Sequence, residues 1–535
     1  MGTHQHRWRL WAYIVAVIVV PSAILALYVG LHQKIIEEHV RQLVVQELMR
    51  RFDSPVELES FHVQFWPTVQ VQGRNLSLLN RNRPGVAPLL RVAEFSFHLG
   101  AVGIFRAPRH IHQITVKNMV ITIPPSGTLR DDSLWQKMRP KAKFATVIDE
   151  LVCDNANLII LPKNPAKEPL DFDIHNLVLK DIMSGSPIPF WGTLTNAKPK
   201  GEIATQGHFG PWDPAEPRST PVAGAYQFTN ADLDPFPGIG GTLSSKGKYS
   251  GQLDRIDVQG TTDTPNFSLD PVGHRVPLHT DFSATVDATD GDTYLHPVRA
   301  VLGHSVIVAN GSVVRAPNKH GHLITLDVVA PEARLEDILS LAMKSDKPTM
   351  TGVTNIKTKL VVVPGKMKTL ERLRLNGEFT VKNANFSSSD VQQKLESLSR
   401  HALGKPNNQN VGSAVSDMSG HFQLNEGQAT FQNLRFAVEG AEVLLDGNYG
   451  IRNEILDFEG QLRLQATLSQ LTTGMKSLLL KPVDPFYRKN GAGAEIPIGI
   501  TGTRENPTIE VKVFHRTIKK QLAATKQEKM VGPMK

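Results

Sequence analysis

The chain lacks the residues that would hold a large body together by covalent cross-links. Only one of its 535 residues is cysteine, Cys153, so no disulfide can form within the chain. Its close neighbours Asp149, Glu150 and Asp154 are acidic, and no basic residue nearby in the sequence would activate the thiol. We therefore expect Cys153 to be a buried structural thiol, and the body to be held by sheet pairing and burial.

Motifs of common enzyme classes are missing as well. The sequence contains no G-x-S-x-G, no H-E-x-x-H and no G-x-x-x-x-G-K-[ST] motif, so nothing indicates a serine hydrolase, a zinc protease or a P-loop enzyme. Beyond the N-terminal run, His110 pairs with His112 and His320 with His322 at His-x-His spacing, but further ligands at metal-binding spacing do not accompany them. We interpret these histidines as exposed strand residues, and we expect no catalytic residue, no metal and no cofactor.

Long hydrophobic runs are rare too, and the one present lies at the N-terminus. Leu10 to Leu31 contains no charged residue, and as a helix it would span the ~30 Å hydrocarbon core of a bilayer. Arg7 and Arg9 precede it, which places the N-terminus in the cytoplasm and the body across the membrane. The run is longer than the apolar region of a signal peptide, and no A-x-A site follows. The sequence therefore predicts a retained single-pass anchor in an inner membrane, with a periplasmic body.

The net charge of the chain indicates which kinds of partner to expect. The net charge is +8 and the pI is about 9.3, a mild excess over so long a chain. Such an excess suits contact with anionic head groups better than a dedicated nucleic-acid surface. We expect no nucleic-acid partner.

Beyond the anchor, apolar residues first recur at helical spacing and then at a period of two. A helix is predicted over 32–53, and afterwards Phe61, Val63 and Phe65 share one face while His62 and Gln64 share the other. Similar alternation, punctuated by Gly and Asn-Gly turns, recurs downstream and predicts a long antiparallel meander. Two short amphipathic helices interrupt it, one opened by Pro331 and one capped by Asp390.

These patterns divide the chain into six segments. They are a cytoplasmic basic N-terminus (1–9), the transmembrane anchor (10–31), a helix (32–53), an N-terminal β region (54–270), a C-terminal β region (271–512) and a basic tail (513–535). The expected fold is mainly β: a long, curved, largely antiparallel sheet behind one transmembrane helix.

Three stretches resemble the AsmA-like family of proteins from Gram-negative-type envelopes. The first is the anchor and helix followed by the strand-like Pro67–Leu78; the second is Arg91–Pro124, with alternating apolar positions. The third is Asp457–Gly460, the helix-like Leu471–Leu480 and the closing Ile496–Pro507, which is similar to the family's "P..I.GT..NP" signature. The region around 150–250 departs most, with longer Pro-rich loops.

The resemblance implies an inner-membrane-anchored periplasmic protein, linked to outer-membrane homeostasis, whose β-groove carries lipid. It brings no catalytic residues, and the chain is shorter than the family's longest members. Phospholipid acyl chains are then the expected partners, together with possible envelope proteins. The residues predicted to line the groove are Phe61, Val63, Phe65, Phe95, Phe97, Phe422, Phe436, Phe458, Leu462 and Leu464.

Alternation alone leaves two interpretations open. The apolar faces could line an open groove that solvates acyl chains, or they could close into filled cores. In the second case the chain would be a structural or assembly scaffold that contacts envelope proteins through its sheet edges.

Overall fold

The computed structural model describes residues 33–64, 69–80, 87–99, 109–125, 146–183, 185–213, 216–269, 274–316, 321–342, 348–403, 416–466, 493–504, 506–513 and 516–521. Among these residues, no helix combines the length and apolarity needed to cross a membrane. The predicted anchor, Leu10 to Leu31, and the helix-like run Leu471–Leu480 lie outside the described residues.

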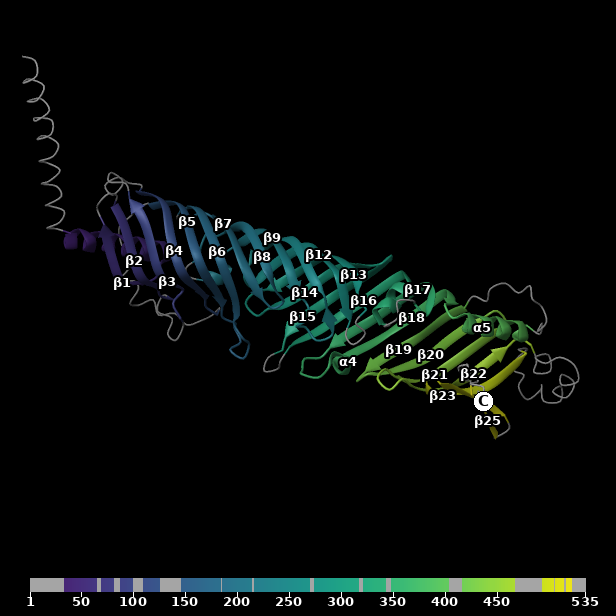
Figure 1. Cartoon of the computed structure of the whole chain (residues 1–535). Helices are drawn as coiled ribbons and strands as arrows, with labels where there is room; N and C mark the ends of the chain where they lie inside the picture. The colour runs from purple at the N-terminus through teal and green to yellow at the C-terminus, as the bar shows by residue number, and fades with distance from the viewer. Residues whose placement is uncertain are drawn as a thin grey trace, which may run out of the picture.

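The body is an elongated, curved sheet that runs the length of the molecule (Figure 1). Its first half contains β1 (Val56–Gln64), β2 (Val69–Leu78), β3 (Leu90–Leu99), β4 (Arg109–Ile123), β5 (Thr146–Ile160), β6 (Leu170–Ile182), β7 (Ile188–Ala197), β8 (Lys200–Phe209), β9 (Val222–Asp232), β10 (Ile239–Gly240), β11 (Thr242–Gln252) and β12 (Arg255–Leu269). Its second half contains β13 (Val276–Asp287), β14 (Asp292–Leu302), β15 (Ser305–Arg315), β16 (His322–Arg334), β17 (Met350–Val362), β18 (Leu373–Phe386), β19 (Ser416–Asn425), β20 (Gln428–Val438), β21 (Ala441–Gly450), β22 (Ile455–Leu464), β23 (Ala494–Thr503), β24 (Pro507–Val513) and β25 (Arg516–Gln521). The helices are one at 33–52, η1 (Pro217–Ser219), α3 (Leu335–Ala342), α4 (Thr369–Arg372) and α5 (Ser389–Ala402).

The strands follow one another as a meander, which confirms the mainly β, largely antiparallel prediction. Successive strands pair antiparallel. The short β10 does not lie between its neighbours in sequence: β9 pairs directly with β11, and β10 pairs with the end of β12. The exception is β4 with β5, which are parallel. Tight hairpin turns link many strands: at Glu426 and Gly427, between β19 and β20, both residues have positive φ, as a type I′ turn requires.

Two local predictions are corrected, and one segment gains a strand. Strand β16 continues through Pro331, and α3 starts only at Leu335; Glu332 adopts a positive φ at a bulge, where a proline costs no ladder hydrogen bond. Helix α5 begins at Ser389, so Asp390 lies inside its first turn and is not the cap. Within the basic C-terminal segment, Arg516–Gln521 forms β25, paired with β24.

Asparagines inside strands help to bend the sheet. Several strand asparagines adopt the left-handed conformation, which asparagine tolerates better than most residues: Asn75, Asn118, Asn155, Asn230, Asn383 and Asn433. At Asn230, Asn383 and Asn433 the register shifts, which marks a β-bulge. Since bulges bend a strand and increase its twist, these residues contribute to the curvature.

One buried arginine joins distant parts of the first half. Arg218, in η1, is 2% exposed, and its Nε donates a hydrogen bond to the carbonyl oxygen of Pro124 at 2.6 Å. A second guanidinium nitrogen donates to the carbonyl oxygen of Leu161. Burial lowers the pKa of Arg218, and the carboxylate of Asp287 partly offsets that effect. The loop containing η1 is thereby fixed to the ends of β4 and β5.

We expect Arg218→Ala to destabilise this junction by about 2–3 kcal/mol, because two carbonyl groups lose their donor inside the protein. Hydrogen exchange at the amides of 216–221 measures the effect, and Arg255→Ala, at an exposed position of β12, serves as the control. Equal protection in the two variants would contradict the assigned role.

Candidate functional site

One face of the sheet is apolar along nearly its whole length. A row of residues paired strand to strand, here called the apolar row, runs from β1 to β23 and contains only hydrophobic residues, tyrosine and glycine. Its members are Val63, Val71, Phe97, Ile114, Leu151, Leu179, Phe190, Gly207, Gly224, Tyr249, Val258, Ala284, Leu295, Gly311, Leu326, Leu360, Leu375, Leu424, Ala429, Tyr449, Leu456 and Gly502. We call the face that carries this row the inner face.

The neighbouring positions on each strand face the other way and are mostly polar and exposed. On β18, for example, Leu375 is half-buried and pairs with Leu360 and Leu424. The next residue, Asn376, is exposed and pairs with Lys359. The period-two alternation read from the sequence thus separates an apolar inner face from a wet outer face.

Side chains of the apolar row are fully buried at the N-terminal end of the sheet and only partly buried along the rest of it. At the N-terminal end, Val63, Val71 and Phe97 are 1%, 0% and 5% exposed. From β4 onward most members of the row, such as Leu179 and Leu360, are only half-buried. A fully packed core would bury these side chains as completely as it buries Val71.

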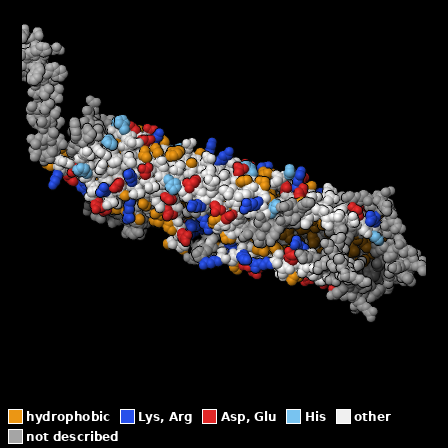
Figure 2. Space-filling model, viewed as in Figure 1, with side chains coloured by type: hydrophobic (Ala, Val, Ile, Leu, Met, Phe, Trp, Pro, Cys, Tyr) orange, Lys and Arg blue, Asp and Glu red, His pale blue; other side chains and the backbone are white. Residues whose placement is uncertain are grey.

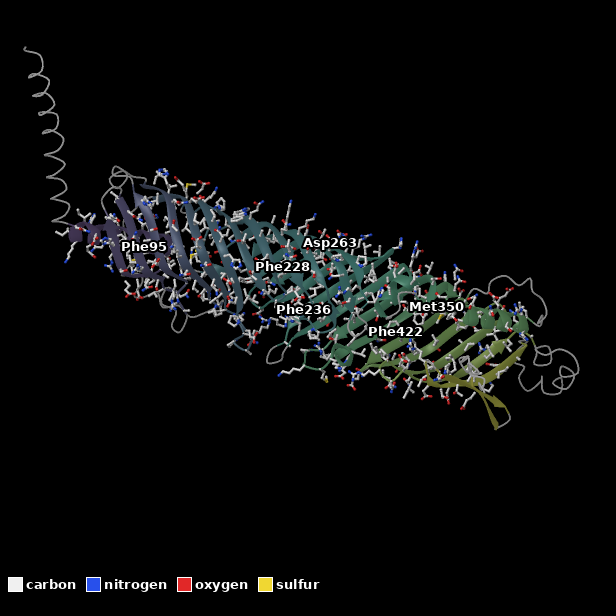
Figure 3. All side chains as sticks on the ribbon, in the orientation of Figure 1. Phe95, Phe228, Phe236, Asp263, Met350 and Phe422 are labelled. Carbon is white, nitrogen blue, oxygen red and sulfur yellow. The ribbon has the colours of Figure 1, made fainter. Side chains whose placement is uncertain are left out.

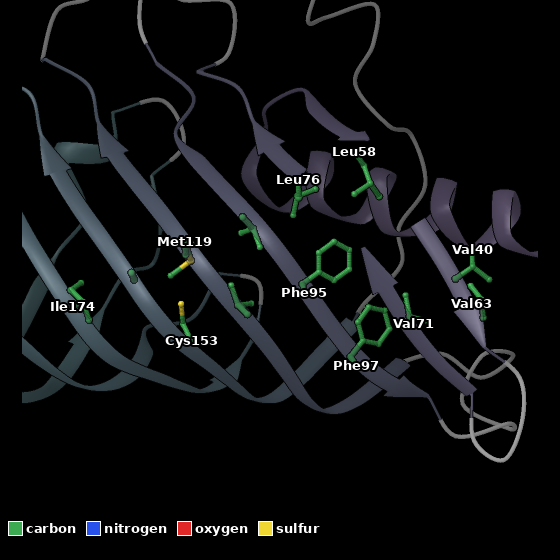
Figure 4. Close-up of a cluster of buried hydrophobic side chains, with 13 residues drawn as sticks. Val40, Leu58, Val63, Val71, Leu76, Phe95, Phe97, Met119, Cys153 and Ile174 are labelled. Carbon is green, nitrogen blue, oxygen red and sulfur yellow. The ribbon is translucent and has the colours of Figure 1, made fainter. Parts of the chain in front are cut away.

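The helix at 33–52 closes the N-terminal end. Val40 is buried against the inner face of β1–β5 (Figure 4). Ile36, Val44 and Leu48 of the same helix are partly buried and pack against this cluster. Polar contacts hold the helix: Arg41 donates to the carbonyl oxygen of Leu58 at 3.0 Å. The carboxylate of Glu37 accepts the backbone N–H of Val63 at 3.1 Å.

In the middle of the molecule, the two rims of the sheet meet. Lys167, in the loop before β6, is 7% exposed and lies 3.2 Å from a carboxylate oxygen of Asp290 and 3.3 Å from one of Asp292, at the turn after β13. Arg315, at the end of β15, donates to the carbonyl oxygen of Glu168 at 3.0 Å. The sheet therefore winds through a full turn between β6 and β13, and its inner face is enclosed there.

Among the described residues of the C-terminal half, two helices each cover a part of the inner face. Helix α3 packs on Val381 and Ala384, and α5 packs through Ala402 on Ala441 and Leu464. Figure 2 shows a recess in this half, within which the visible side chains are hydrophobic.

The structure places the predicted N-terminal lining residues in the closed end. Val63, Phe95 and Phe97 are buried beneath the helix at 33–52, and Phe61 is half-buried against the same cluster. They face inward as predicted, but the helix occupies the space that a ligand would need. Phe65 lies outside the described residues.

The predicted C-terminal lining residues also face inward, with different degrees of cover. Phe422 on β19 is half-buried, with its ring 6.2 Å from that of Phe379, and Figure 3 marks it far from Phe95 along the sheet. Phe436 and Leu462 are half-buried beside the cluster under α5. Phe458 is 7% exposed and Leu464 4% exposed. Of the ten predicted residues, Phe422 best fits an accessible groove.

Residues of the middle strands were missed, although they carry the same signal. Leu151, Leu179 and Phe190 lie on the inner face and are half-buried. They alternate with polar residues such as Glu150 and Lys180. The alternation at these strands could have identified them.

The two histidines predicted as exposed strand residues on β4 are solvent-exposed. His110 and His112 are both exposed and lie 3.8 Å and 2.8 Å from Asp149, whereas His320 lies outside the described residues. Within the part of the chain that the structure describes, no three potential ligands form a metal site.

Cys153 is fully buried in the N-terminal core, as predicted for a structural thiol. Burial raises the pKa of its thiol to about 11. Because the thiolate is the reactive form, we expect N-ethylmaleimide at pH 7.5 to modify the native protein at least about 100-fold more slowly than the unfolded chain. Mass spectrometry of the intact protein measures both rates, and rapid modification without unfolding would contradict this placement.

Comparison with known proteins adds no relative: no family model, no curated protein and no solved structure matches the chain.

Proposed function

We propose that the chain is a membrane-anchored envelope protein that binds lipid acyl chains along its inner face and conducts them, contributing to outer-membrane lipid homeostasis. The anchor is Leu10 to Leu31, and the body lies in the periplasm. No reaction is part of this proposal, and no cofactor or nucleic acid takes part.

The observation that carries the proposal is the apolar row beyond the closed end. Its members stay hydrophobic over many strands and yet remain half-buried, so part of their surface is available to a ligand. Each methylene removed from water there contributes ~0.8 kcal/mol, which makes a long acyl chain a favourable occupant. Charged head groups would stay outside, where the outer face and the rims are polar.

The direct test is photo-crosslinking in full-length protein within its membrane. A photoreactive phenylalanine analogue at Leu375 faces the groove, and the same analogue at Asn376 faces outward from the adjacent position. We expect phospholipid adducts at 375 and few at 376. Absence of lipid adducts at 375, with protein adducts in their place, would favour an assembly scaffold.

A further inference from the structure

The inner face changes character in the middle of the molecule. On β8 to β13 it carries hydroxyl side chains, one of which, Thr264, is 2% exposed. The other six are here called the hydroxyl belt: Thr205, Tyr226, Ser245, Tyr249, Thr262 and Thr280. Thr205 pairs with Tyr226, Ser245 pairs with Thr262, and Thr262 pairs with Thr280 across neighbouring strands. Tyr249 belongs to the apolar row, and the others lie two or four residues from a member of it, so all share the inner face.

In the hydroxyl belt, the tyrosine protons are used in hydrogen bonds within the protein, so the tyrosine oxygens remain as acceptors for a ligand. Thr205 donates to the carbonyl oxygen of Ala225, so Tyr249, 2.8 Å from the Thr205 hydroxyl, is the donor in that contact. Ser245 likewise donates to the carbonyl oxygen of Thr261, so Tyr226 donates to Ser245 at 3.1 Å. Both tyrosine oxygens therefore keep lone pairs that can accept.

The pair on β12 and β13 supplies the complementary group. The hydroxyls of Thr262 and Thr280 lie 2.6 Å apart, and only one of the two protons is needed for that contact. The second proton is a donor for a ligand. The belt thus offers acceptors and a donor side by side, as a ligand carrying both a hydroxyl and a carbonyl group requires.

The rings of the two tyrosines lie over glycines of neighbouring strands. A Cβ added to Gly224 would come within 2.7 Å of the Tyr249 hydroxyl oxygen, and one added to Gly247 within 2.9 Å of the Tyr226 ring. The tyrosines therefore lie low across the sheet. Apart from Ser245, which is buried, the belt residues are half-buried and can be reached by a ligand.

No charge accompanies these hydroxyls on the inner face. Along β8, β9, β11, β12 and β13, whose residues are all described, the charged side chains, such as Glu202, Lys248 and Asp281, occupy outward positions, alternating with inner residues. The same section is the one enclosed where Lys167 meets Asp290 and Asp292. A phosphate or ammonium group inside it would be desolvated without an ionic partner, at a large free-energy cost.

We propose that the hydroxyl belt is a polar subsite for an uncharged glycerolipid that bears a free hydroxyl, such as a diacylglycerol. This inference rests on the proposed lipid-binding function and narrows it. Phospholipids bind by their acyl chains in the less enclosed C-terminal half, with the head group outside. An uncharged lipid enters the enclosed section, where its hydroxyl and ester groups bond to the belt.

The test compares two photoactivatable lipids with the same diazirine-bearing acyl chains, a diacylglycerol and a phosphatidylglycerol, added to full-length protein. Peptide mapping locates the adducts. We expect the diacylglycerol to label β8–β13 at least about tenfold more than the phosphatidylglycerol does, and both to label β16–β22.

Thr262→Val with Thr280→Val keeps the shape of the belt and removes two hydroxyls; we expect diacylglycerol labelling of β8–β13 to fall about fivefold or more. Thr261→Val, at the adjacent outward position, is the matched control and leaves labelling unchanged. Equal labelling of β8–β13 by both lipids, or an unchanged double variant, overturns the subsite while leaving acyl-chain binding intact. Failure of both lipids to label any inner strand overturns the proposed function itself.

Discussion

Replacing Leu375 by aspartate is expected to lower the amount of phospholipid that co-purifies with the full-length protein about tenfold or more. Leu375 lies in the apolar row between Leu360 and Leu424, and it is half-buried. A carboxylate there would face acyl chains without an ionic partner, which costs more than the 1.4 kcal/mol or so that corresponds to a factor of ten. Quantitative mass spectrometry of extracted lipid measures the loss.

The adjacent residue offers a matched control. Asn376→Asp introduces the same charge on the same strand, but on the outer face and opposite Lys359, where it is solvated and attracted by a cation. We expect its lipid content to equal that of the unmodified protein. A similar loss of phospholipid from both variants would show that the added charge disturbs folding, and that it does not act by blocking acyl chains in the groove.

The second large effect is expected at the closed N-terminal end. Phe97 is 5% exposed, stacks near Phe95 with ring centroids 6.3 Å apart, and lies in the cluster with Val40. Phe97→Ala removes a fully packed ring, and such changes cost about 3–5 kcal/mol. We expect hydrogen exchange at the amides of β1–β4 to accelerate accordingly, and Cys153, in the same cluster, to react faster with maleimide.

Ser96→Ala, on the opposite face of β3, is the control for this experiment and should change protection by no more than about 0.5 kcal/mol. Lipid binding in the C-terminal half should persist in both variants, because that half has its own clusters under α3 and α5. Unchanged exchange in Phe97→Ala would mean that the helix at 33–52 does not seal this end.

Local periodicity was sufficient to predict a largely antiparallel meander and the face of the side chains on the strands it identified. Each side chain's direction follows from a period of two, so Val63, Phe97 and Phe422 were assigned to the inner face without knowledge of their partners. The helix over 32–53 was predicted within a residue at each end, because its apolar positions recur at helical spacing.

What periodicity could not supply was the arrangement of segments distant in sequence. The contact of Lys167 with Asp290 joins residues 123 positions apart, and no local pattern signals it. Likewise, alternation at Val63 and Phe97 is identical whether a helix or a ligand covers those residues. The strand through Pro331 was misread because a bulge accommodates a residue that usually ends a strand.

The most direct measurement is a cryo-electron microscopy map of the full-length protein purified from membranes with its native lipids retained. If acyl chains occupy the inner face, elongated density unconnected to the protein will run along it over Leu326, Leu360 and Leu375. An inner face packed throughout by protein side chains, with no such density, would contradict it.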